Sequence, residues 1–127
     1  MSGMKKVLSG ALAALCITGT TEAHGDLARL FAGCAGRFSA ELEHAWLMNQ
    51  DKSADLAMQR QDMLVLLDAT MDRSDARALL AYRIEAKLAQ AALLTLSDFS
   101  VDEARARDAR RLAERHRTTC HRLLLGA

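Results

Sequence analysis

The chain has 127 residues, 17 of them lysine or arginine and 16 aspartate or glutamate, which gives a formal net charge of +1. This near-neutral balance offers no general electrostatic reason to bind DNA or RNA, so nucleic acid is not an expected partner. Proline is absent, whereas alanine, leucine and arginine are abundant, and this composition favours helix over sheet. We therefore expect an all-α protein.

The first residues resemble a secretory signal peptide. Two lysines precede the apolar run 7–18, and "TEA" ending at Ala23 fits a small-x-small cleavage site. The run is well short of the roughly 20 residues that a membrane-spanning helix needs, so cleavage is favoured over retention as an anchor. The sequence thus predicts a signal peptide over residues 1–23 and one periplasmic domain over residues 24–127, with no membrane span after cleavage.

Apolar residues recur at spacings of three and four along four segments, which predicts four amphipathic helices. The predicted helices span residues 26–48, 54–70, 75–96 and 102–125. Ser53, Ser74 and Ser100 lie at or near the starts of the last three and are the expected N-caps. Because short connections favour antiparallel neighbours, we expect an antiparallel up-down four-helix bundle.

Cys34 in the first predicted helix and Cys120 in the last both lie at the centre of an apolar stripe. The first and last helices of such a bundle are commonly neighbours, and disulfides persist in oxidising compartments. We therefore predict a Cys34–Cys120 disulfide, which would stabilise the fold by about 4 kcal/mol in the chain-entropy model. Two buried free thiols are the alternative. Gly33 and Gly36, which flank Cys34, are expected to let the last helix approach closely.

Glu41 lies about 20° from Cys34 on the helical wheel, inside the apolar stripe, where an unpaired carboxylate would be costly. An antiparallel last helix would place His116 less than one turn from the level of Glu41, and His116 also faces inward. We expect Glu41 and His116 to form a buried polar pair with a structural role. Arg37 and Arg117 are alternative partners, and a functional polar site is the alternative role.

Three patterns point toward a metal or haem, and each is incomplete. Glu41-x-x-His44 has the spacing of di-iron bundles, but such sites need the motif twice with two further glutamates. "RTTCH", residues 117–121, resembles the haem-attachment signature that cytochromes c′, which are four-helix bundles, carry in their last helix; arginine replaces the first cysteine. After cleavage the α-amine and imidazole of His24 could chelate copper, but a copper site needs further nitrogen ligands, and the sequence brings no other histidine close to that end. We expect no metal site and no cofactor.

Two surfaces are candidates for binding. Apolar residues that fall away from the predicted core define a candidate partner surface made of Trp46, Leu47, Leu79, Leu93 and Leu96. The same wheel places Leu80, Ile84, Leu88 and Ala91 in the core. Arginines along the outer face of the last helix define a candidate anion-binding face made of Arg107, Arg111, Arg115 and Arg122. Ordinary solvated or packed faces are the alternative in both cases.

The sequence contains no Ser-His-Asp arrangement, glycine-rich phosphate loop or zinc-protease signature, so we expect no catalytic residues and no enzyme. It favours an exported, non-enzymatic binding or accessory module whose partner is another protein. The alternative is a metal-, haem- or small-ligand-binding bundle that uses Glu41, His44, His116 or His121.

Overall fold

The computed structural model describes residues 20–126, which are helical apart from short connections. The helices are α1 (Thr20–Leu47), α2 (Ser53–Thr70), α3 (Ala76–Phe99) and α4 (Glu103–Gly126), with a short 3-10 helix η1 (Arg73–Asp75) before α3. The all-α class and the four predicted helices are confirmed.

Most of the predicted signal peptide, residues 1–19, lies outside the described part of the chain. Its last four residues, Thr20–Ala23, form the first turn of α1, which therefore begins before the predicted start at Asp26. Within residues 20–126, no helix has the length and apolar character needed to cross a membrane.

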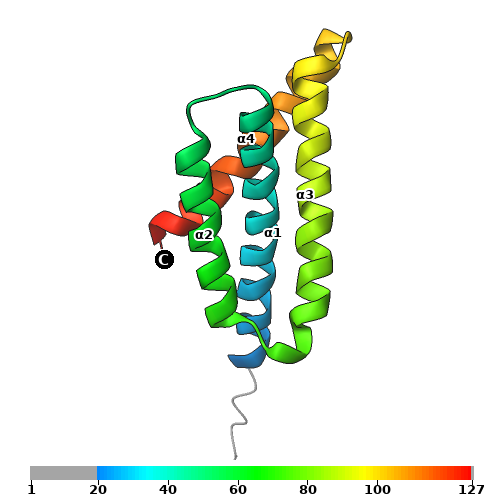
Figure 1. Cartoon of the computed structure of the whole chain (residues 1–127). Coiled ribbons are helices and arrows are strands. Elements are labelled where there is room, and N and C mark those ends of the chain that lie inside the picture. Colours follow the sequence, from blue (N-terminus) through cyan, green and yellow to red (C-terminus); the bar gives the residue numbers. More distant parts are fainter. Residues whose placement is uncertain (1–19, 127) are drawn as a thin grey trace, which may run out of the picture.

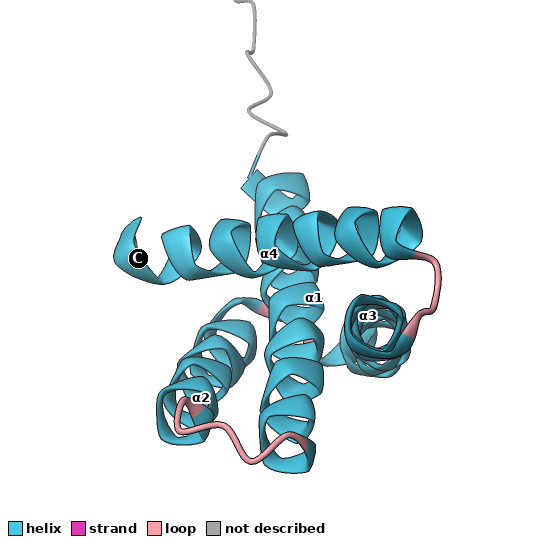
Figure 2. Ribbon diagram, turned by 90° about the horizontal axis from the view of Figure 1, so that it is seen from above, coloured by secondary structure: helices cyan, strands magenta, loops and turns pink. Residues whose placement is uncertain are grey.

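α1 is the central helix of the fold (Figure 1). α2 runs back along one side of α1, and α3 runs along the other side in the same direction as α1. The backbones of α2 and α3 each pack against α1 but do not approach one another. α4 leaves the end of α3 and crosses α1 steeply to finish beside α2, as Figure 2 shows from above. The crossing closes the bundle on one side of α1.

The hydrophobic core surrounds the middle of α1, where consecutive residues are buried on every side of the helix. The largest buried side chains of α1 are Phe31, Phe38 and Leu42, and α2 adds Leu56, Met63 and Leu67. The buried residues of α4 are Ala106, Ala109, Ala113 and Cys120. Because these side chains are small, the backbone of α4 lies close to the helices that it crosses.

Two glycines let α1 approach α3. A Cβ atom on Gly36 would clash with the backbone carbonyl of Arg83, and one on Gly33 would lie 3.2 Å from the ring of Tyr82. The prediction that these glycines face the last helix is therefore wrong. Gly36 lies about 200° round the helix from Cys34, so it points away from α4 when Cys34 points toward it.

Aspartates cap η1 and α4 in place of the predicted serines, and no side chain caps α3. The carboxylate of Asp102 accepts the backbone N–H groups of Ala104 and Arg105 at 3.0 and 3.2 Å, while the Ser100 hydroxyl accepts the N–H of Asp102. Asp72 has the same role before η1. No side chain caps α2, which begins at Ser53 itself. Serine and aspartate are both good caps, and in both connections the aspartate is the residue directly before the first helical residue.

Candidate functional site

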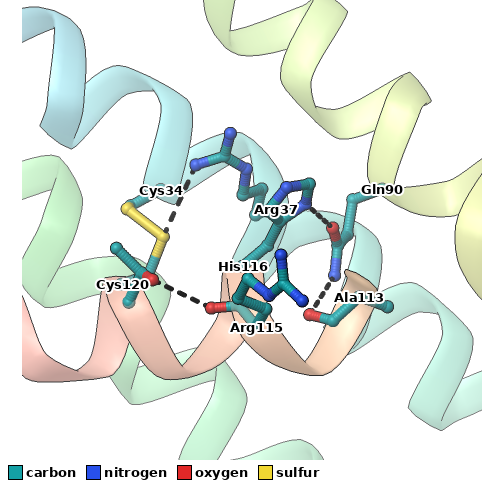
Figure 3. Close-up of a disulfide and its surroundings, with 8 residues drawn as sticks. Cys34, Arg37, Gln90, Ala113, Arg115, His116 and Cys120 are labelled. Carbon is teal, nitrogen blue, oxygen red and sulfur yellow. Dashed lines mark hydrogen bonds between the residues drawn. A yellow bond between two sulfur atoms is a disulfide. The ribbon is translucent and has the colours of Figure 1, made fainter. Parts of the chain in front are cut away.

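The Cys34–Cys120 disulfide joins α1 to α4 where the two helices cross (Figure 3). The two Cα atoms lie 5.4 Å apart and are separated by 86 residues along the chain, and the predicted bond is confirmed. Both cysteines are buried, and Nη1 of Arg37 lies 3.9 Å from the Cys120 sulfur. Because Cys120 is bonded to Cys34, its sulfur is not available for a thioether bond to haem.

A buried polar network lies next to the disulfide, between α1, α3 and α4 (Figure 3). Gln90 of α3 is its centre and is only 1% exposed. Its amide nitrogen donates to Glu41 Oε1 at 2.8 Å and to the carbonyl oxygen of Ala113 at 3.1 Å. Its amide oxygen lies 3.1 Å from Nδ1 of His116. Glu41 and His116, the predicted polar pair, are thus both bound to Gln90.

The partners of Gln90 fix the orientation of its amide and the tautomer of His116. The Ala113 carbonyl only accepts hydrogen bonds, so the amide nitrogen faces it and Glu41 Oε1, and the amide oxygen faces His116. Nδ1 of His116 therefore donates its hydrogen to that oxygen. Burial lowers the pKa of His116, and the positive charges of Arg37 and Arg115 lower this pKa further. The structure thus favours a neutral imidazole.

The candidate partner surface is wrong for α3. Leu79 is only 8% exposed, and Leu93 and Leu96 are partly buried. Of the four residues of α3 predicted to lie in the core, three are on the surface instead: Leu80 and Ile84 are each 49% exposed and Leu88 is 63% exposed. Ala91 is partly buried. Trp46 and Leu47 of α1 are exposed, at 61% and 72%.

The α3 prediction failed because this helix carries leucines on most of its sides, so hydrophobic periodicity does not select one face. Close packing on α1 selects it instead. The buried residues of α3 are Leu79, Ala86, Gln90 and Ser97, three of which are small or polar. The buried position of Gln90 could not be predicted for the same reason, because a single amide side chain among alanines and leucines is expected to face solvent. Two small residues of α3 could have indicated its buried face. They are Ala86, seven residues after Leu79, and Ser97, eleven residues after Ala86.

An apolar cleft of about 230 Å³ opens between the second half of α2 and the start of α3. Its apolar lining is Leu64, Leu67, Met71, Ala76, Leu79 and Leu80, and its charged residues are Asp68 and Arg83. Leu80 connects the cleft to the exposed residues Ile84 and Leu88. We refer to Leu80, Ile84 and Leu88 as the α3 stripe.

The histidines lie apart from one another. Nε2 of His44 is 2.6 Å from Oδ2 of Asp98. His24 lines a separate pocket of about 720 Å³ with Asp72 and Asp75, and His121 is exposed on α4. Within residues 20–126, no three His, Cys, Asp or Glu side chains are grouped so that they could hold a metal ion.

The four arginines of the candidate anion-binding face, Arg107, Arg111, Arg115 and Arg122, are all exposed on α4. Arg111 pairs with Asp108 at 3.0 Å, and within residues 20–126 the other three form no ion pair. Residues 103–126 contain seven arginines and three acidic residues, a net charge of +4, whereas residues 20–102 contain eight basic and thirteen acidic residues, a net charge of −5. The near-neutral total therefore conceals a strong separation of charge.

Together these features define a disulfide-linked, all-α four-helix protein with a buried amide-centred network, an apolar cleft and a basic fourth helix. Comparisons with models of protein families, with curated proteins and with solved structures find no match to this chain.

Proposed function

We propose that this protein is an exported, non-enzymatic binding module that holds an apolar helix of a partner protein in the cleft between α2 and α3. The observation that supports the proposal is the cleft itself. α2 and α3 lie on either side of α1 without their backbones approaching each other, and apolar side chains between them remain open to solvent. Contiguous exposed apolar surface of this kind is typical of a docking site.

The form of the cleft suits a helix of the partner. Amphipathic helices bind in grooves through apolar residues at spacings of three and four. The α3 stripe repeats every four residues over roughly two turns, about 12 Å, and extends the apolar surface from Leu80 at the cleft to the exposed Ile84 and Leu88. Asp68 and Arg83 carry opposite charges at the cleft, so they would favour one direction of the bound helix.

Export is supported by two observations. The Cys34–Cys120 disulfide belongs to a class of bond that persists in oxidising compartments and is rare in a reducing cytosol. The first 23 residues have the charge and apolar pattern of a secretory signal. A periplasmic location is therefore part of the proposal.

The test is site-specific photocrosslinking in the cells that produce the protein. A photoreactive phenylalanine analogue is placed at Ile84 or Leu88 of the α3 stripe, and at Val101 as a fully exposed apolar control outside the cleft. We expect one polypeptide to be crosslinked from Ile84 and Leu88 but not from Val101. Adding Leu80→Asp should abolish the adduct from Leu88. The same adducts at all three positions, or none at Ile84 and Leu88, would refute the proposal.

A further inference from the structure

The outer face of α4 is a line of arginines. The buried residues Ala106, Ala109, Ala113 and Cys120 define the inward direction of this helix. On the helical wheel, Arg111, Arg115 and Arg122 lie within about 30° of the opposite direction, and Arg107 lies about 50° from it. From Arg107 to Arg122 the line is about 22 Å long. These four residues are the basic face of α4.

No other helix of the described chain covers this face. Figure 2 shows α4 crossing α1 as an outer bar, with α2 and α3 on either side of α1. None of the four arginines lines the apolar cleft or the two polar pockets. The basic face is therefore an open array of charges, in which Arg111 is paired with Asp108, and not part of a cavity that would enclose a small anion.

The distribution of charge gives the face a preferred orientation. α4 carries +4, whereas residues 20–102 carry −5, so an extended anionic surface attracts α4 and repels the rest of the protein. The protein as a whole is nearly neutral and is not attracted in this way. The attraction therefore arises only when α4 faces the anionic surface.

We propose that the basic face of α4 docks this protein on a lipid bilayer that contains acidic phospholipids. Laterally mobile headgroups can gather under a linear array of arginines, and arginine side chains reach a membrane surface while their stems contact apolar groups. Leu125, 74% exposed, lies about 50° from the outward direction near the end of α4 and adds an apolar contact. This inference does not depend on what occupies the cleft.

The test is cosedimentation of the purified, disulfide-bonded protein with vesicles of phosphatidylcholine alone or mixed equally with phosphatidylglycerol. The variant Arg111→Gln/Arg115→Gln/Arg122→Gln removes three charges from the basic face. The matched control, Lys52→Gln/Arg73→Gln/Arg77→Gln, removes three exposed positive charges from other parts of the molecule. Circular dichroism and thermal melting establish that both variants fold.

We expect binding to the acidic vesicles only, and weaker binding at high salt. Each arginine near an acidic membrane contributes about fivefold in affinity, so the α4 variant should bind about 100-fold more weakly and the control nearly as well as the native protein. Equal losses in both variants, no preference for acidic vesicles, or binding to soluble dextran sulfate without binding to vesicles would overturn the proposal. Ile84→Asp, which alters the α3 stripe, should leave vesicle binding unchanged, so this test and that of the cleft can fail separately.

Discussion

At the scale of single residues, Gln90 determines how the core of this protein holds its polar groups. Glu41 is 3% exposed, and its one hydrogen bond within residues 20–126 comes from the amide nitrogen of Gln90. The same side chain also satisfies the carbonyl of Ala113 and the imidazole of His116. A buried network of this kind is stable only when each polar group has a hydrogen-bond partner. Replacing one member should therefore destabilise the fold more than replacing the hydrogen-bonded members together.

We expect Gln90→Leu to lower the free energy of unfolding by about 3 kcal/mol, because Glu41 would remain buried without a hydrogen-bond donor. The double variant Glu41→Leu/Gln90→Leu should be more stable than Gln90→Leu, since two apolar side chains then replace the polar pair. Urea denaturation of the native protein, both single variants and the double variant measures this coupling. Strictly additive losses would show that the two side chains are energetically independent.

The network also predicts how stability depends on pH. Burial, with the charges of Arg37 and Arg115, lowers the pKa of His116 below its ordinary value of 6.5. The unfolded chain therefore binds the proton more readily than the folded chain, and stability should fall as pH drops from about 7 through 6.5 toward the lower pKa of the folded state.

His116→Asn tests this dependence, because asparagine keeps a donor near the position of Nδ1 but does not titrate. We expect the variant to lose less stability than the native protein between pH 8 and pH 5, as measured by urea denaturation at each pH. Parallel curves for the two proteins would mean that His116 does not contribute to the pH dependence.

At the scale of the elements, the contact between α1 and α3 depends on Gly36. Gly36→Ala should destabilise the protein by about 2 kcal/mol, because the added methyl group must displace the backbone of α3 at Arg83. Gly25→Ala is the matched control, since no atom lies within 4 Å of its added Cβ, and it should be neutral or stabilising by up to about 1 kcal/mol. Thermal and urea unfolding compare the two. An unchanged stability of Gly36→Ala would contradict the close approach.

The helices and the disulfide could be predicted from the sequence because apolar residues recur at helical spacing and α4, which carries Cys120, is clearly amphipathic. In α4, charged residues surround a narrow line of alanines that ends at Cys120, so only one face can be buried. α3 offers no such contrast, and its buried face was predicted wrongly. The orientation of α3 depends on its close contact with Gly36 of α1. A contact between two helices produces no periodic pattern in the sequence of either helix. The same contact brings Gln90 between Glu41 and His116, which explains why the site could be predicted only in part.

At the scale of the whole molecule, the disulfide holds α4 in its crossing position over α1. Cys34→Ala/Cys120→Ala should lower the free energy of unfolding by about 4 kcal/mol, because the unfolded chain gains the freedom of an 86-residue separation. Urea denaturation of the double variant, compared with the native protein with and without reductant, measures the loss. A variant as stable as the oxidised protein would show that packing alone holds α4 in place.

The two proposed binding surfaces lie on different parts of the molecule. The cleft is formed by α2 and α3, whereas the basic face belongs to α4. A protein docked on a bilayer through α4 would keep the cleft free for a partner, so the two roles are compatible. Both depend on a folded, oxidised protein outside the cytosol.

The intact mass of the protein, recovered from the cells that make it without any reductant, tests this central claim most directly. We predict a chain that begins at His24 and is lighter than the reduced form by the two hydrogens lost in forming the Cys34–Cys120 bond. A chain that begins at Met1 would contradict cleavage of the signal peptide. A chain with both thiols free would contradict covalent closure of the fold in an oxidising compartment, and with it the proposed role.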